Sequence, residues 1–138
     1  MKLLRKTTTA AAALLATAAF ADVNVGISLS LTGPGSGLGI PMNNYYTKSF
    51  PKTIGGEKVN LIIADDATDP GKGVANVRRF ITEDKVDVII GSTITPVAAA
   101  IAPLAAESKT VQLAASPVGV PDDSWTFRLP QGNDVMMH

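Results

Sequence analysis

Three hydroxyl side chains follow a short apolar run in the middle of the chain, and their spacing suits the binding of a small anion. The run is residues 86–90, and after a glycine the chain carries Ser92, Thr93 and Thr95. Thr95 precedes a proline, an order typical of a helix N-cap followed by the first helical position. The backbone N–H groups at such a helix start attract negative charge. We therefore predict that these hydroxyls line a ligand site at the end of a strand.

The groups that most enzymes use are scarce in this sequence. The single histidine is the last residue, His138, and there is no cysteine. A serine–histidine–aspartate triad, a thiol nucleophile and a cysteine-type zinc site therefore find no support. No phosphate-binding Gly-Lys-Ser/Thr pattern occurs. We accordingly expect a binding module with no catalytic residues, no metal and no cofactor.

Three aspartates lie within five positions, and such a cluster can hold a divalent cation or accept a phosphoryl group. They are Asp65, Asp66 and Asp69. Asp69 precedes Pro70, which is the order of an N-cap and a first helical residue. The other two follow an apolar run, where aspartate solvates a strand end or accepts hydrogen bonds from the loop backbone. We favour this structural interpretation for all three.

A glycine-dense loop at residues 32–39 invites comparison with the dinucleotide-binding pattern G-x-G-x-x-G. The sixth position counted from Gly33 is Leu38, and counted from Gly35 it is Ile40, so the spacing fails both times. The loop is then either a flexible connection or a place where the backbone approaches a ligand. The sequence leaves both alternatives open.

Residues 1–21 have the composition of a signal peptide that is cleaved before Asp22. They begin with a basic segment, continue with an uncharged stretch at residues 7–20, and end in the small-x-small order Ala-Phe-Ala. The uncharged stretch is shorter than the roughly 20 residues that span a bilayer. We therefore predict export to the periplasm.

Removing the first 21 of the 138 residues leaves 117, which by length is one domain. Without the three basic residues of the leader, 9 Lys and Arg residues face 12 Asp and Glu residues. A mildly acidic surface of this kind gives no reason to expect a nucleic-acid partner.

The remaining chain alternates between strand and helix patterns, which predicts an α/β fold with a parallel sheet and right-handed crossovers. Pro41 is expected at the start of one helix, and Pro103 is expected to kink or split another. The predicted strands are residues 22–31, 58–64, 86–90, 110–115 and 125–129, and the predicted helices are 41–50, 70–83 and the segment after Thr95. Residues 50–56 are predicted to form a turn.

Four blocks of the sequence resemble the periplasmic leucine/isoleucine/valine-type binding proteins of ABC transporters, which have the type I periplasmic binding fold. The blocks are residues 25–39, 65–70, 86–95 and 113–117, in the order that the family uses. The resemblance implies two α/β lobes with the ligand between them. Residues 22–129 would form the first segment of lobe one and residues 130–138 the start of the hinge and lobe two. The chain would then be an amino-terminal portion of a longer protein.

The resemblance also assigns roles to site residues. Thr95 stands where the family places a hydroxyl that holds the carboxylate of an amino acid, and Leu38 stands where some members have an aromatic cover. The second ligand loop of the family, which holds the ammonium group of an amino acid through a backbone carbonyl and a hydroxyl, matches residues 114–120. The contacts that we expect from it are Ala115, Ser116 and Val118. The hydroxyl expected shortly after Pro117 is absent. This departure argues against an unmodified α-amino acid as the ligand and favours other small carboxylates.

These observations predict an exported, monomeric solute-binding protein of an ABC importer. Its ligand would be an amino acid of the branched-chain type or a similar small carboxylate, which it would deliver to a membrane permease. Two alternatives remain at this point. They are a doubly wound α/β enzyme with a nucleotide cofactor and the ligand-sensing ectodomain of a receptor.

Overall fold

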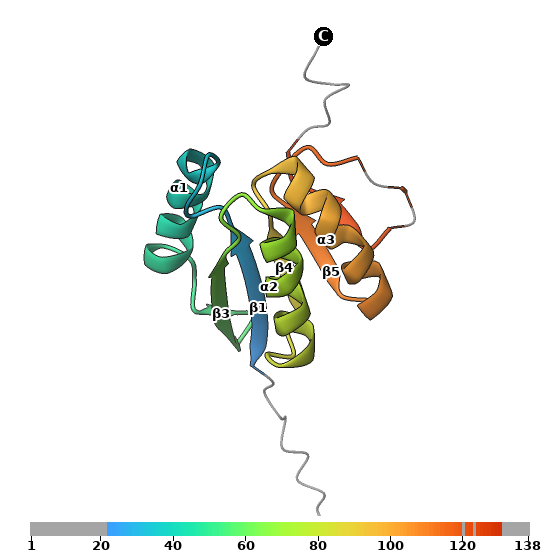
Figure 1. Ribbon diagram of the computed structural model, residues 1–138. Coiled ribbons are helices and arrows are strands. Elements are labelled where there is room, and N and C mark those ends of the chain that lie inside the picture. The colour runs from blue at the N-terminus through green and yellow to red at the C-terminus, as the bar shows by residue number, and fades with distance from the viewer. Residues whose placement is uncertain (1–21, 120, 123, 131–138) are drawn as a thin grey trace, which may run out of the picture.

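One six-stranded sheet organises the part of the chain that the structure describes, which is residues 22–119, 121, 122 and 124–130. In this computed structural model the strand order is β2-β3-β1-β4-β5-β6, and only the β2–β3 pair is antiparallel (Figure 1). The strands are β1 (Val23–Leu29), β2 (Thr53–Ile54), β3 (Glu57–Asp65), β4 (Val88–Gly91), β5 (Val111–Ala114) and β6 (Thr126–Arg128). The helices are α1 (Ser36–Lys48), α2 (Pro70–Thr82) and α3 (Thr95–Ser108). The predicted α/β class is confirmed.

Successive side chains of the central strand β1 point to opposite faces of the sheet, and each face carries an apolar core. Val25, Ile27 and Leu29 are buried in a cluster on the face that α1 covers. The opposite parity carries small residues, and a Cβ at Gly26 would lie 2.6 Å from Cδ2 of Phe80. Glycine at this position therefore lets α2 pack close against the sheet.

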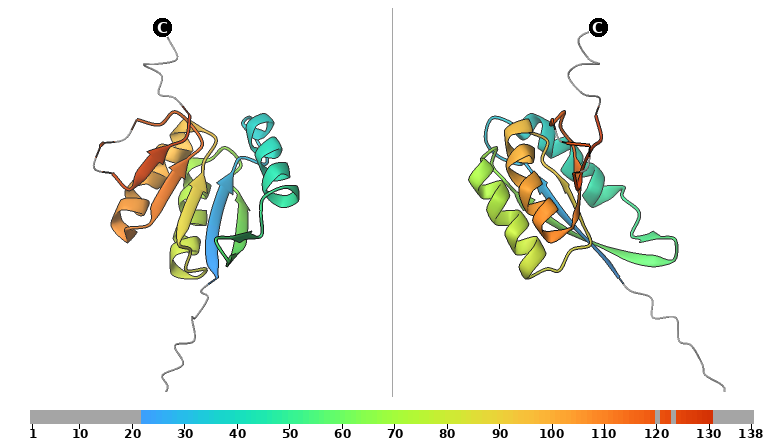
Figure 2. Two further views of the ribbon diagram at one scale, coloured as in Figure 1. Left: turned by 180° about the vertical axis from the view of Figure 1, so that it is seen from behind. Right: turned by 90° about the vertical axis from the view of Figure 1, so that its right-hand side faces the viewer.

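The helices α2 and α3 cover the other face of the sheet, as the right-hand view of Figure 2 shows. Val77 and Phe80 of α2 and Val97 and Ile101 of α3 are fully buried in one cluster with Ile89 of β4. Both helices thus pack apolar side chains against this face of the sheet.

Two helix starts differ from the sequence prediction. The helix α1 begins at Ser36 and not at Pro41, because the glycine-dense loop already forms its first turn, and Pro41 lies inside the helix. The predicted N-cap role of Thr95 is wrong as well. The last residue before α3 with extended backbone is Ile94 (φ −114°, ψ 125°), so Thr95 is the first helical residue. Asp69 caps α2 as predicted.

Two further expectations need correction. The helix α3 runs unbroken through Pro103. Pro103 and Ala99, whose carbonyl loses its helical donor, both lie on the exposed side, where water can bond to that carbonyl. The predicted turn at residues 50–56 also contains the short strand β2. Gly55 and Gly56 adopt positive φ angles of 61° and 91°, as a two-residue hairpin loop requires.

The loops after β1, β4 and β5 leave the same edge of the sheet, the upper edge in Figure 1, because these strands are parallel. From β1 the chain passes to β3 on one side and later to β4 on the other, and α1 and α3 lie on opposite faces. Sheets of this kind bind ligands where the strand order reverses. Here that point lies between β1 and β4.

Some predictions fall on other parts of the chain. The predicted signal peptide (residues 1–21) and the predicted helix start after Asn133 lie outside the described residues. Within residues 22–130, apart from 120 and 123, no helix has the length and apolar character needed to cross a bilayer.

Candidate functional site

The loops after β4 and β5 place most of the predicted site residues at the carboxyl edge of the sheet. The two strands are parallel neighbours, so Ser92 and Thr93 follow one strand and Ala115 and Ser116 follow the next. Thr95 is the first residue of α3 and is half-buried. Two hydroxyl-bearing loops and one helix N-terminus therefore meet at this edge, an arrangement that can bind an anion.

Two of the predicted site hydroxyls are buried without a partner. Within the described part of the chain, neither Thr93 Oγ1 nor Ser116 Oγ makes a hydrogen bond. Thr93 is 6% exposed and Ser116 is 1% exposed. An unsatisfied buried hydroxyl costs about 1–3 kcal/mol of stability. A ligand that hydrogen-bonds to both hydroxyls would recover much of that free energy.

The Ser92 hydroxyl is engaged with the protein interior. The side chain is fully buried, and its Oγ donates a hydrogen bond to Oδ2 of Asp66 at 2.7 Å. The same oxygen accepts a longer bond of 3.4 Å from the Ile94 N–H. The single hydroxyl proton of Ser92 is therefore already shared with Asp66.

Asp66 accepts a hydrogen bond from the loop backbone, as predicted, but it also accepts bonds from a buried set of hydroxyls that the sequence analysis did not predict. It does not solvate a strand end, because it is 0% exposed. Its carboxylate accepts hydrogen bonds from the hydroxyls of Ser28 (3.3 Å), Ser30 (2.5 Å) and Ser92 (2.7 Å), and from the Thr68 N–H (3.0 Å). The alternation of β1 carries a signal for this network. Ser28 and Ser30 occupy the polar parity of a strand that must be buried on both faces, so their hydroxyls need an internal partner.

Asp65 accepts hydrogen bonds from the loop backbone, as predicted. Its carboxylate accepts bonds from the N–H groups of Leu31 (2.8 Å), Thr32 (3.2 Å) and Ala67 (2.8 Å), and from the Thr32 hydroxyl (2.6 Å). Burial acts to raise the pKa of Asp65. The hydrogen bonds from Thr32, Ala67 and Leu31 outweigh burial and hold the pKa below its ordinary value.

The glycine-dense loop packs against the loop after β4. The Gly35 N–H donates to Oγ1 of Thr68 at 2.9 Å, and a Cβ at Gly35 would lie 2.7 Å from Cδ1 of Ile94. The close packing needs glycine at this position and brings the backbone of the loop beside the candidate site. Leu38, in the first turn of α1, is 59% exposed.

Val118 is placed differently from the other predicted contacts. It is 1% exposed and packs in a small cluster with Ala98 of α3 and Ala114 of β5. Its N–H donates to the Ser116 carbonyl at 2.8 Å. The Val118 side chain therefore belongs to the apolar core, and the loop turns tightly at Ser116.

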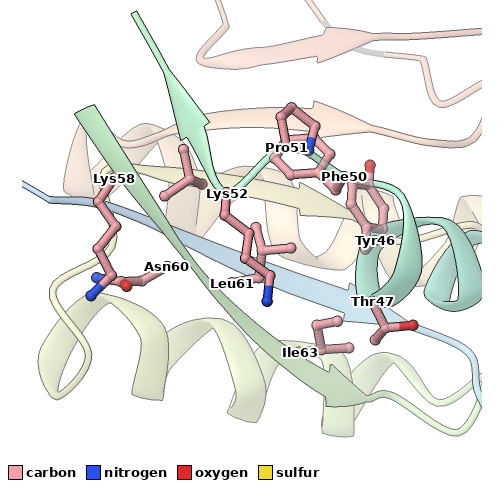
Figure 3. A pocket seen from close by; sticks show the side chains of 10 residues that line it. Tyr46, Thr47, Phe50, Pro51, Lys52, Lys58, Asn60, Leu61 and Ile63 are labelled. Atoms are coloured by element: carbon pink, nitrogen blue, oxygen red, sulfur yellow. The ribbon is translucent and has the colours of Figure 1, made fainter. Parts of the chain in front are cut away.

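Two cavities of the described residues do not include this site. One of about 420 Å³ lies between α1, the β2–β3 hairpin and the outer edge of β3, where Figure 3 shows Lys52 and Lys58 beside the strand. Another of about 530 Å³ lies over the sheet face beside α1. No predicted site residue lines either cavity. In the described segments no group of three or more His, Cys, Asp or Glu residues is placed to hold a metal ion.

The family of the chain follows from comparison with known proteins. A family model described as periplasmic binding protein matches residues 22–136. This chain belongs to the periplasmic binding protein family. The resemblance carried by the four sequence blocks is thereby confirmed. A search of curated proteins found no match.

Solved structures share the fold. An extracellular ligand-binding receptor from Rhodopseudomonas palustris HaA2 is 37% identical, with a TM-score of 0.80 over 85% of this chain and 33% of that one. A solute binding protein of an ABC transporter from Rhodopseudomonas palustris BisB5, in complex with 3,4-dihydroxybenzoic acid, is 29% identical, with a TM-score of 0.68 over 80% of this chain and 32% of that one. A leucine binding protein from Thermotoga maritima is 23% identical, with a TM-score of 0.69 over 82% and 34%.

The chain spans about a third of the length of these relatives. They are two-lobed binding proteins, which confirms the predicted fold class. Membership of the periplasmic binding protein family supports the expectation of a binding protein, so the alternative of a doubly wound enzyme with a nucleotide cofactor is set aside.

Proposed function

We propose that this chain is part of an exported solute-binding protein of an ABC importer, and that its carboxyl-edge loops bind the carboxylate of a small organic acid. The protein would act as a monomer in the periplasm after cleavage before Asp22, and would deliver its ligand to a membrane permease. Residues 22–129 would form the first segment of lobe one, and residues 130–138 would begin the hinge and lobe two.

The unpaired hydroxyls of Thr93 and Ser116 are the observation that carries this proposal. Both are buried, they lie on neighbouring loops, and the first lies two residues before the start of α3. A carboxylate accepts hydrogen bonds from hydroxyls and from the free N–H groups of a helix N-terminus. Thr95, at the first position of α3, adds a third hydroxyl to the same edge. One carboxylate group suits all of these donors.

The ligand class is supported from two sides. The ABC transporter relative that is 29% identical is in complex with 3,4-dihydroxybenzoic acid, an aromatic carboxylate. In this chain the hydroxyl that the resemblance expects shortly after Pro117, for an ammonium group, is absent, and Val118 packs in the apolar core. We therefore propose an aromatic or aliphatic acid first, and an amino acid of the branched-chain type second. Leu38 and Ala115 would contact the apolar part of either ligand.

The test is a binding experiment on the protein encoded by the complete reading frame. Isothermal titration with 3,4-dihydroxybenzoate, benzoate and L-leucine is compared with benzamide and L-leucinamide, which lack the carboxylate. Loss of hydrogen bonds to a charged group costs about 1.5–3 kcal/mol, so the amides should bind about 10- to 100-fold more weakly. Equal binding of an acid and its amide would refute the carboxylate site.

Variants then locate the site on this chain. Thr93→Val and Ser116→Ala should each weaken carboxylate binding about tenfold or more. Thr82→Val is the matched control, because Thr82 is exposed near the end of α2 and its hydroxyl bonds only to the Arg78 carbonyl. Unchanged affinity in both site variants would show that the ligand binds elsewhere.

A receptor ectodomain is the second candidate, because the relative that is 37% identical is described as an extracellular ligand-binding receptor. Reading the frame past the codon for His138 separates the two roles. Transport is supported if the frame continues to about three times the present length, which is the length of the relatives, and contains no apolar segment of roughly 20 residues. Such a segment after the second lobe would support the receptor.

A further inference from the structure

Two buried polar side chains hold the junction between β4 and the candidate ligand loop. The Ser92 Oγ donates to Oδ2 of Asp66 at 2.7 Å, and Nε2 of Gln112 donates to the Gly91 carbonyl at 2.9 Å. Asp66 and Gln112 are both 0% exposed and come from the end of β3 and from β5. The Gly91–Ser92 segment is thus held by Gln112 of the neighbouring strand β5 and by Asp66 at the end of β3, which lies beyond β1 in the sheet.

The chemistry of Asp66 fixes the direction of the hydrogen bond. A carboxylate only accepts, so the Ser92 hydroxyl must donate to it. Its oxygen lone pairs are then free for the Ile94 N–H, which lies 3.4 Å away. Asp66 therefore orients both the side chain of Ser92 and the backbone that leads to α3.

The junction also has no room to move toward β1. A Cβ at Gly91 would lie within 2.0 Å of the Ser28 carbonyl oxygen, so the backbones of β4 and β1 are in close contact there. Ser28 itself donates to Asp66 at 3.3 Å. The loop can therefore be displaced only by breaking its bonds to the buried polar groups.

We infer that Asp66 is a positioning residue for ligand binding: by accepting the Ser92 hydroxyl, it fixes the loop that presents Thr93 and the N-terminus of α3 to the ligand. Asp66 itself does not touch the ligand, because both of its carboxylate oxygens already accept hydrogen bonds from protein donors. The inference rests on the proposed function. It adds that affinity depends on a carboxylate 26 residues away in sequence from the loop that it holds.

Ser92 and Ser30 make a matched pair for the test. Both hydroxyls are buried and both donate to Asp66, but Ser30 donates to Oδ1 and Ser92 to Oδ2. Oδ1 also accepts the Thr68 N–H, so the carboxylate keeps an anchor when Ser30 is removed. A role limited to stability would make Ser30→Ala and Ser92→Ala equivalent.

The experiment uses the protein encoded by the complete reading frame and 3,4-dihydroxybenzoate as the probe. Ser92→Ala and Asp66→Asn should raise the Kd for the probe about tenfold, while Ser30→Ala stays within about twofold. Equal changes of Kd in Ser30→Ala and Ser92→Ala would overturn the inference. So would an unchanged Kd in Ser92→Ala.

Amide hydrogen exchange provides a readout that needs no ligand. In the free protein, Asp66→Asn should speed exchange of the Ile94 N–H relative to wild type, because Ser92 is no longer held in place as its acceptor, and Ser30→Ala should not. If the wild-type protein binds no carboxylate but this exchange pattern holds, the proposed function fails and the positioning of the loop by Asp66 stands. Equal exchange at Ile94 in both variants overturns the positioning as well.

Discussion

Replacing Gly73 by alanine tests how tightly α2 and α3 pack beneath the candidate site. Gly73 is buried in α2, and a Cβ there would lie 2.4 Å from Cγ1 of Val97. Val97 belongs to the first turn of α3, the helix whose N-terminus carries Thr95. A side chain at position 73 would therefore push directly on the start of α3.

Two effects of opposite sign decide the outcome of Gly73→Ala. Alanine is favoured over glycine inside a helix by about 0.8–1.0 kcal/mol. Overpacking a filled core costs about 1–3 kcal/mol. We expect the steric cost to win, with a net loss of about 1 kcal/mol in the free energy of unfolding. After Val97→Ala the next atom is Cδ1 of Ile101 at 3.5 Å, which is ordinary contact, so Gly73→Ala should then stabilise by about 0.8 kcal/mol.

The assay is a double-mutant cycle measured by urea unfolding of the wild type, the two single variants and the double variant. The coupling between positions 73 and 97 should be about 2 kcal/mol, well above the roughly 0.5 kcal/mol that independent sites show. Gly37→Ala is the matched control, because a Cβ at Gly37 in α1 meets nothing within 4 Å, and it should stabilise in both backgrounds. The packing argument would be refuted if Gly73→Ala changed the free energy of unfolding by the same amount in the wild type and in Val97→Ala.

The other predictions concern the core and the loss of stability at acidic pH. Phe80→Ala should lower the free energy of unfolding by about 3–5 kcal/mol, because Phe80 is fully buried, whereas Phe127→Ala, at a residue 56% exposed, should change it by no more than about 0.5 kcal/mol. Asp65 has a lowered folded pKa, so it stabilises above the ordinary aspartate pKa of about 3.9, and this contribution is lost as pH falls through the folded value. Asp65→Asn should therefore flatten the dependence of stability on pH below about 4, and equal slopes for variant and wild type in acid unfolding would contradict this.

Local patterns were sufficient to predict most of the fold. The alternation of residues 22–31 predicted β1, and Asp69 before Pro70 predicted the start of α2, because both signals depend only on neighbours in sequence. The start of α1 was not predictable in this way. Glycine is a poor helix former, yet the loop after Gly35 is helical, since the bond to Thr68 and the contact with Ile94 fix it from outside.

The candidate site could be predicted in composition but not in the roles of its hydroxyls. Ser92 and Thr93 are adjacent and chemically alike, and both are buried. The structure distinguishes them because Asp66 lies within reach of Ser92, whereas Thr93 Oγ1 has no partner among the described residues. That difference depends on the register of β3, β1 and β4, which sequence spacing alone does not specify. The hydroxyl left unpaired by the register is therefore the one that we expect to bind ligand, and its neighbour holds the loop in place.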